Sequence, residues 1–402
     1  MTKPVLLFLL GCSSGSVVIL PHVKWGPIPI TYVTCALLFA LGLLLLPKTR
    51  RRYSLSFLWL SAPAAYIALL GVFMDGIDPS QVLARNLSAL LAGLILICFV
   101  RDRRSLQAAL LGLSVPVLMN VSAALAQSFD FGGLGSFVAG MADMVGQDDD
   151  EDISDVAGFR IYGLQGKAHV FAYNMALIGV MFLLAVPYIH SRMARTLCLS
   201  TALLCGFAVF LSAQRSAFWP LVFAYAVLGA TMLLQRGHRG KLVAGSALAI
   251  AVGFLFYFSG NISESNSAVA RLYTGFGEQG GDFVRAASWS AAEDVIFMDP
   301  WFGRAFFHYA QGIGIHNAFL GGWARFGVFW LISFLAIVSL HLIRLARQIP
   351  VYLKIGEVCI LGLLAGNYFF HSQIPTFNDM IFYISLAFVP AVAYAVHRES
   401  NA

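Results

Sequence analysis

The chain has 402 residues, of which 59% are hydrophobic and only 11% are charged, and its mean hydropathy is +0.78. Soluble globular proteins carry about 25% charged residues, so this composition excludes a soluble domain and predicts an integral membrane protein. The formal net charge of +6 at pH 7 reflects the uneven placement of basic residues in the loops and does not imply a nucleic-acid partner.

Helices that cross a bilayer need roughly 17 to 25 mainly apolar residues. Most connections between the apolar runs are very short, which favours antiparallel packing of neighbours in one membrane domain covering residues 1–402. We therefore predict an all-α polytopic membrane protein. Its twelve or so spans lie at about 5–20, 28–46, 53–73, 82–100, 105–128, 169–190, 197–213, 217–234, 241–259, 317–343, 351–371 and 378–397.

The six cysteines all lie in these apolar runs without CxxC spacing, so they predict small buried side chains and neither disulfides nor a metal site. The stretch that ends at Cys12 is similar to a lipoprotein cleavage site. The apolar run before Cys12 is too short for a signal peptide, and we expect no cleavage.

Orientation follows from the charges in the loops. Most of the 26 lysine and arginine residues fall in alternate connections, and all but three of the 20 acidic residues, Asp102, Glu357 and Glu399, fall in the other set. Basic loops stay in the cytoplasm. The pattern predicts a membrane protein with an even number of spans and with both termini in the cytoplasm.

Two long loops break the pattern of short connections, and both are predicted on the outer face, opposite the cytoplasm. The first, about 129–168, contains the acidic run 148–152, which is either a solvated loop or a divalent-cation site. The second, 260–316, lies between the ninth and tenth spans and carries several arginines. Long loops on a rigid scaffold are frequent sites of function, so we expect the second loop to be catalytic.

Within the second loop, the sequence after Gly281 predicts a surface helix that is capped by Asp282. Arg285 would lie in its first turn, above an apolar strip that contains Trp289, Ala292 and Ile296. An arginine beside the unpaired N–H groups of a helix start favours an anion. We therefore expect Arg285 and Trp289 to contact a substrate.

Another arginine, Arg215, lies in the tight outer turn between the seventh and eighth spans, against the trend of basic residues toward the cytoplasm. It either reaches lipid headgroups or holds an anion at the membrane surface. We group the neighbouring Gln214 with the substrate-binding residues. Arg160 and Lys167, at the end of the first loop, either bind substrate or balance the acidic run.

His316 and Asn317 directly precede the tenth span, which places the imidazole near a helix N-terminus. The helix dipole there favours a neutral ring that can accept a proton. The alternative is an interfacial histidine packed beside Trp323. Arg325, about two turns into the same span, must face the bundle interior or a water-filled cavity, and Asp379 is a candidate partner for it or for His316.

Three further polar residues lie in apolar spans: Arg85, Asn86 and Asn120. They either line the same cavity or form hydrogen bonds between helices.

Taken together, these residues resemble the O-antigen ligase and polymerase superfamily of bacterial inner-membrane glycosyltransferases. His316-Asn317, nine residues and then Gly327 is similar to the ligase signature, although Trp330 replaces a small residue at its end. The segment from Arg285 to Gly303 and the turn around Arg215 resemble two further family segments. The likeness covers roughly residues 160–330.

The resemblance implies transfer of a glycan from undecaprenyl pyrophosphate to a sugar hydroxyl of the lipid A–core oligosaccharide, on the periplasmic face, without metal, nucleotide or other cofactor. His316 would be the general base. Arg215 and Arg285 would bind the pyrophosphate and stabilise its developing charge. Direct displacement would invert the anomeric carbon.

Three alternatives stay open at this point. An O-antigen polymerase or a protein O-oligosaccharyltransferase would use the same donor and similar residues. A transporter or flippase of lipid-linked glycans would instead need ionisable positions near the bilayer midplane.

Overall fold

The computed structural model describes residues 3–15, 24–25, 28–45, 58–73, 79–129, 133–137, 161–165, 167–235, 281–304, 315, 317–346, 349–370 and 380–400. The predicted span at 241–259 and the predicted site residues Arg160, His316 and Asp379 lie outside these ranges.

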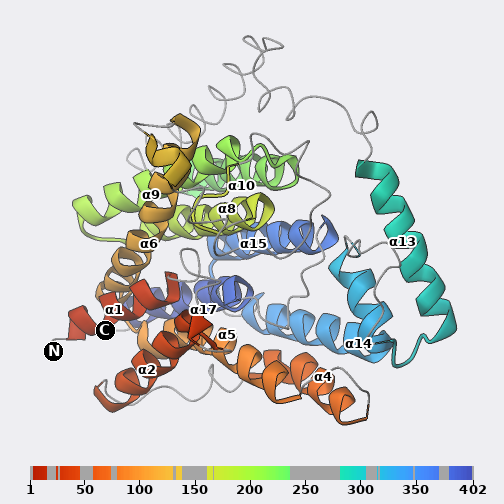
Figure 1. Cartoon of the computed structure of the whole chain (residues 1–402). Coiled ribbons are helices and arrows are strands. Elements are labelled where there is room, and N and C mark those ends of the chain that lie inside the picture. The colour runs from red at the N-terminus through yellow and green to blue at the C-terminus, as the bar shows by residue number, and fades with distance from the viewer. Residues whose placement is uncertain are drawn as a thin grey trace.

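The described chain is almost entirely helical (Figure 1). Two residue pairs depart from the all-α prediction: β1 (Lys24–Trp25) and β2 (Ile28–Pro29) form a minimal antiparallel ladder. The helices are α1 (Lys3–Gly15), α2 (Ile30–Leu45), the 3-10 helix η2 (Trp59–Ser61), α4 (Ala62–Phe73), α5 (Pro79–Phe99), α6 (Arg103–Phe129), α8 (Ala168–Ala185), the 3-10 helix η5 (Val186–Tyr188), α9 (Arg192–Leu211), α10 (Arg215–Gln235), α13 (Gly281–Met298), α14 (Ala318–Ala346), α15 (Val351–Phe370) and α17 (Met380–Ser400).

Every predicted span within the described ranges coincides with a helix, wholly or in part. Length and composition suffice for crossing a membrane in five of them, which confirms a helical membrane protein: Arg103–Phe129, Ala168–Tyr188, Arg192–Leu211, Ala318–Ala336 and Val351–Phe369. The total number of spans stays a prediction.

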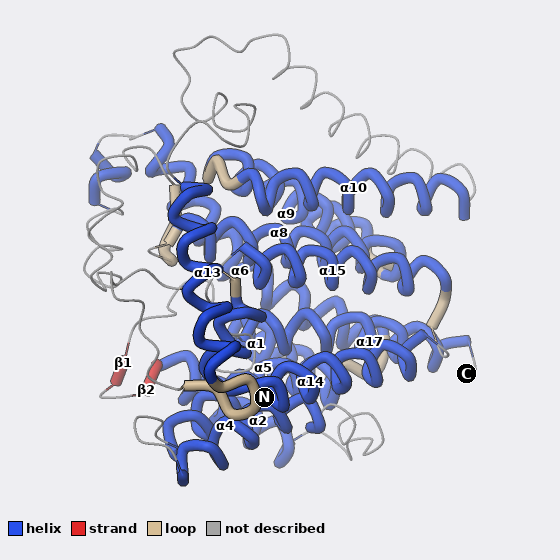
Figure 2. Tube along the Cα trace, turned by 90° about the vertical axis from the view of Figure 1, so that its right-hand side faces the viewer, coloured by secondary structure: helices blue, strands red, loops and turns tan. Residues whose placement is uncertain are grey.

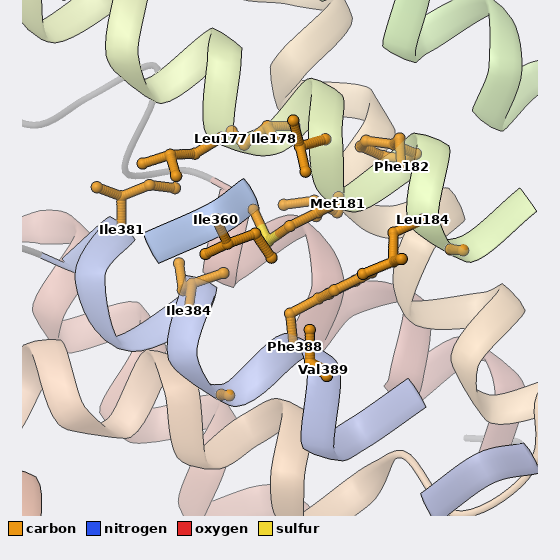
Figure 3. Close-up of a cluster of buried hydrophobic side chains, with 14 of the residues drawn as sticks. Leu177, Ile178, Met181, Phe182, Leu184, Ile360, Ile381, Ile384, Phe388 and Val389 are labelled. Carbon is orange, nitrogen blue, oxygen red and sulfur yellow. The ribbon is translucent and has the colours of Figure 1, made fainter. Parts of the chain in front are cut away.

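Helix α8 forms the centre of the bundle and is buried along nearly its whole length. It packs against α9, α10, α15 and α17. Figure 3 shows one part of this core, in which Met181 of α8 meets Ile360 of α15 and Ile384 of α17. Because all sides of α8 are covered by protein, its sequence is apolar all round and shows no polar face.

Glycines bring α1 and α6 into backbone contact. A Cβ atom on Gly112 would overlap the carbonyl oxygen of Phe8, and a Cβ atom on Gly11 would overlap that of Ala109. Small residues at helix crossings allow this close approach, which supplies packing energy where no hydrophobic force drives helices together in lipid.

A buried hydrogen bond joins α5 to α17: the Asn86 side-chain amide donates to the Tyr383 hydroxyl. This confirms the expectation of a helix–helix hydrogen bond for Asn86. The side chain of Arg85 lies outside the described part of the structure.

Helix α13 lies steeply across the bundle, at a large angle to α10, α14, α15 and α17, and both views show it at one end of these helices (Figures 1 and 2). We call this end, formed by α13, the first turns of α8, α10 and α14 and the last turns of α15, the α13 end.

Candidate active site

A chain of contacts shows that these helix termini meet. The hydroxyl of Tyr173 in α8 donates to the Ser216 carbonyl in the first turn of α10 at 2.9 Å, and it also lies beside Gly366 of α15. The ring of Tyr368 contacts that of Phe319, in the first turn of α14, with 6.4 Å between centroids. Segments far apart in the sequence therefore share one surface.

Helix α13 is fixed to this surface by its apolar side. Ala292 and Ile296 are buried against the first turns of α14, as the predicted strip required. Trp289 is half-buried, and its ring meets that of Phe369 of α15 edge to face at 5.5 Å. Arg285 lies on α13 near its start, but its side chain is outside the described part. The predicted loop helix is present as α13, but it begins at Gly281, so Asp282 lies inside its first turn and does not occupy the predicted cap position.

Arg215 is the first residue of α10 and is half-buried at the α13 end. The turn before it reverses sharply through Ala213, which has a φ of 54°. The Gln214 carbonyl then accepts the N–H groups of Ala217 and Phe218 at 3.1 and 2.9 Å. A cation at a helix N-terminus is disfavoured by the helix dipole, by about 0.3–1 kcal/mol. An anion bound there would remove this cost.

Asn317 caps α14. Its Oδ1 atom accepts the N–H groups of Phe319 and Leu320 at 3.0 and 3.1 Å, and the side chain is buried. An N-cap asparagine ordinarily has this role. The side-chain oxygen of Asn317, a residue also predicted to bind substrate, is therefore engaged by the backbone. The cap fixes the chain directly after His316, at the α13 end.

Lys167 lies at the N-cap position of α8, half-buried, with no side-chain capping bond. The segment before it is held by α6: Gln127 accepts the Gly163 N–H at 2.9 Å, and Asn120 accepts that of Leu164 at 2.7 Å. Asn120 was expected to line a cavity or to hydrogen-bond another helix, but its described bond is to the backbone of the segment that precedes α8. Arg160 precedes this segment and lies outside the described residues.

The most unusual feature of the site is a break in α14. Gly327 has φ 77° and ψ 175°, so the helical bond from the Val328 N–H to the Ala324 carbonyl is lost. A loop replaces it: the Val328 N–H donates to the Pro300 carbonyl at 2.9 Å, and the Arg304 N–H donates to the Ala324 carbonyl at 2.8 Å. Both freed backbone groups are satisfied, as an interruption at membrane depth requires.

Two glycines make this docking possible. Gly303 has a φ of 69°, and a Cβ atom there would come within 2.7 Å of the α14 backbone. The conformation of Gly327 belongs to a region that only glycine occupies readily, and a Cβ atom there would overlap the Trp301 carbonyl. Sequence analysis noted both glycines as motif residues but missed that they touch. Trp323 closes the contact by donating from Nε1 to the Pro300 carbonyl at 3.0 Å.

Arg325 is half-buried in this interrupted stretch of α14. Its Nε atom is buried and makes no hydrogen bond with any described residue. Asp379, the candidate partner, is not among those residues, so the pairing stays a prediction. Trp330, which departs from the ligase signature, is fully buried and stacks on Phe334 at 5.7 Å, which gives it a packing role.

In sum, Arg215, Asn317, Trp289 and the start of α8 share the α13 end. Within the described ranges, no group of three or more His, Cys, Asp or Glu side chains could hold a metal ion. Sequence reasoning missed Tyr173, whose hydroxyl ties α8 to α10. A tyrosine in an all-apolar helix carries no signal of that role.

These features define a helical integral membrane protein with a cation-bearing cluster of helix termini at one end. No protein-family model matches the chain, and no curated protein matches it either.

Proposed function

We propose that this protein is an O-antigen ligase: it transfers a glycan from undecaprenyl pyrophosphate to a sugar hydroxyl of the lipid A–core oligosaccharide. The observation that supports the proposal most directly is that the α13 end contains Arg215 at the start of α10, the Asn317 cap that follows His316, and α13, which carries Arg285. Three helix N-termini with two arginines and a histidine suit a diphosphate leaving group and a proton transfer.

In the proposed reaction, the acceptor hydroxyl oxygen attacks the anomeric carbon of the donor sugar. The bond from that carbon to the diphosphate oxygen breaks, and the polyprenyl diphosphate leaves with the electron pair. His316 takes the hydroxyl proton, a contribution worth about 10² to 10⁴ in rate. Arg215 and Arg285 bind the diphosphate and stabilise its growing charge. Attack opposite the leaving group inverts the anomeric carbon.

The proposed orientation places the α13 end in the periplasm, where lipid-linked glycans are available but nucleotides are not. It follows from the charges: basic residues concentrate in the loops at the other end, among them Arg101, Arg103 and Arg104 before α6. The remaining proposed substrate contacts are Gln214, Asn317, Trp289, Lys167, Arg160, Arg325 and Asp379.

One observation favours the transporter alternative. Glu357, counted with the cytoplasmic charges in the sequence, is only 3% exposed within α15, and neither carboxyl oxygen has a hydrogen-bond partner among the described residues. An ionisable residue at such a position is more typical of proton or ion pathways than of scaffolds.

The experiment uses purified protein in lipid nanodiscs, undecaprenyl-pyrophosphate-linked glycan, rough lipopolysaccharide and EDTA. Products are separated on a gel. We expect a ladder on lipid A–core with the wild type and with Arg104→Ala, an exposed arginine at the opposite end. His316→Ala and Arg215→Ala should lose the ladder.

Each other outcome favours an alternative. Growth of the glycan on its own lipid carrier would make the protein a polymerase. Transfer to a protein acceptor would make it a protein O-oligosaccharyltransferase. No bond formation, together with ATP-independent movement of the lipid-linked glycan across vesicles that Glu357→Gln abolishes, would make it a transporter.

A further inference from the structure

Large apolar side chains are exposed where α13 ends and the docking loop begins. Phe297 is 83% exposed, Met298 67%, Trp301 58% and Phe302 52%. Two of them lie on the last turn of α13 and two follow Pro300. We call these four residues the apolar loop patch. A patch of this kind on a soluble surface marks a binding partner.

The patch continues the exposed face of α14. The Phe329 ring contacts the rings of Trp301 and Phe302, with centroid distances of 5.8 and 6.0 Å. Phe329 is followed at helical spacing by Ile332 and Leu335, and all three are about half exposed. On a membrane-crossing helix, an exposed apolar face of this kind contacts lipid.

The crossing part of α14 limits where the patch can lie. The stretch of α14 that is long and apolar enough to cross a membrane is Ala318–Ala336, and it contains Phe329. The rings of Trp301 and Phe302, which contact Phe329, therefore lie beside a lipid-facing part of α14.

The loop backbone is prepared for an apolar environment. Beside the two bonds that repair the α14 break, the Gly303 N–H donates to the Asp299 carbonyl at 3.2 Å, and the Phe302 N–H donates to Asp299 Oδ1 at 3.4 Å. The Pro300 carbonyl and the N–H groups of residues 302–304 thus bond within the protein, while the apolar side chains are exposed. This division is what lipid demands of a non-helical segment.

The charged residues around the patch mark the water side. Glu293 and Asp294 are exposed one turn before Phe297 and Met298, and Arg304 is exposed just after the docking loop. An arginine at this position reaches lipid headgroups readily.

We propose that residues 297–302 are a re-entrant anchor whose apolar loop patch contacts the acyl chains of membrane lipid at the headgroup boundary of the leaflet on the α13 side. The anchor holds the C-terminal end of α13 at the membrane surface and shields the repaired break in α14 from water. This proposal requires that the protein is an integral membrane protein, but it does not require the proposed ligase activity.

The test uses tryptophan fluorescence in nanodiscs made with phosphatidylcholine brominated at a shallow or a deep acyl position. The contribution of Trp301 is the difference between wild type and Trp301→Phe. We expect bromines at the shallow position to quench more than half of the Trp301 fluorescence. Bromines at the deep position should quench a smaller part of it. The control is Trp330→Phe, because Trp330 is fully buried at a similar level of α14 and its contribution should resist quenching.

A second variant guards against misfolding of Trp301→Phe. Phe297→Trp adds a fluorophore at the most exposed patch position, away from the docked backbone, and its added emission should be quenched in the same way. Quenching of either contribution by aqueous iodide instead of bromolipid would overturn the proposal. Protection from both quenchers would also overturn it, because another protein segment or a second copy would then cover the patch.

Discussion

Gly327 of α14 and Trp301 of the docking loop are in direct backbone contact, and no side chain larger than hydrogen fits between them. The two residues are 26 positions apart in the sequence. Their contact joins the loop helix α13 to the helix that follows His316, so the loop and the membrane bundle form one unit at the α13 end.

Replacement of Gly327 by alanine should separate the two segments. The new methyl group would overlap the Trp301 carbonyl, and the φ of 77° is costly for alanine, by about 1–3 kcal/mol. We expect a lower thermal unfolding midpoint in nanodiscs. If the proposed function holds, the rate of glycan transfer should also fall at least tenfold.

Gly321→Ala in the same helix is the matched control. A Cβ atom there meets Ile315 at an ordinary 3.5 Å, and alanine favours helix by about 1 kcal/mol relative to glycine. Its stability and activity should equal or exceed those of the wild type. Equal behaviour of the two variants would contradict the docking contact.

The role of Asn317 can be separated into cap and substrate contact. Loss of an N-cap costs about 1 kcal/mol, so Asn317→Ala should lower the unfolding midpoint and reduce transfer by misplacing His316. Asn317→Asp and Asn317→Ser keep an oxygen that can accept the N–H groups of Phe319 and Leu320, and we expect both to retain most stability and activity. If Asn317→Asp and Asn317→Ser lose activity while their stability is unchanged, the side-chain N–H group of Asn317 contacts substrate.

Tyr173→Phe should weaken the hold of α8 on the first turn of α10. The lost hydrogen bond to the Ser216 carbonyl is worth about 1 kcal/mol, and its loss frees the backbone beside Arg215. The comparison is Tyr225→Phe, which removes an equivalent bond to the Ala202 carbonyl between α9 and α10. We expect similar unfolding midpoints for both variants but a several-fold higher KM for the lipid-linked donor with Tyr173→Phe alone. An equal change in KM for Tyr173→Phe and Tyr225→Phe would show that Tyr173 has no special role at the donor site.

Packing of α1 on α6 gives a prediction about the scaffold. Gly112→Ala should destabilise the protein by about 1–3 kcal/mol, the usual cost of overpacking, because its methyl group would overlap the Phe8 carbonyl. Gly362→Ala in α15 has no neighbour within 4 Å of the new atom and should be tolerated. The measurement is the unfolding midpoint of each variant in detergent. An unchanged midpoint for Gly112→Ala would mean that α1 is not packed against α6 as described.

Sequence alone predicted the membrane class, the positions of the described helices and the loop helix α13. These properties are local: apolar runs of bilayer length and an apolar strip at helical spacing need no knowledge of neighbours. Residue type and position near helix ends also led the sequence to predict Arg215, Arg285, His316 and Asn317 as site residues, and their roles stay predictions.

Only the tertiary structure decided which of these ends meet and what each polar side chain does. The side-chain oxygen of Asn120 accepts a backbone N–H from the segment before α8, and that of Asn317 accepts one from the first turn of α14. The break at Gly327 is repaired by the main-chain carbonyl of Pro300 and the main-chain N–H of Arg304, so no side chain marks the contact. Contacts between backbone groups distant in the chain leave no mark in a single sequence except the glycines that make room for them.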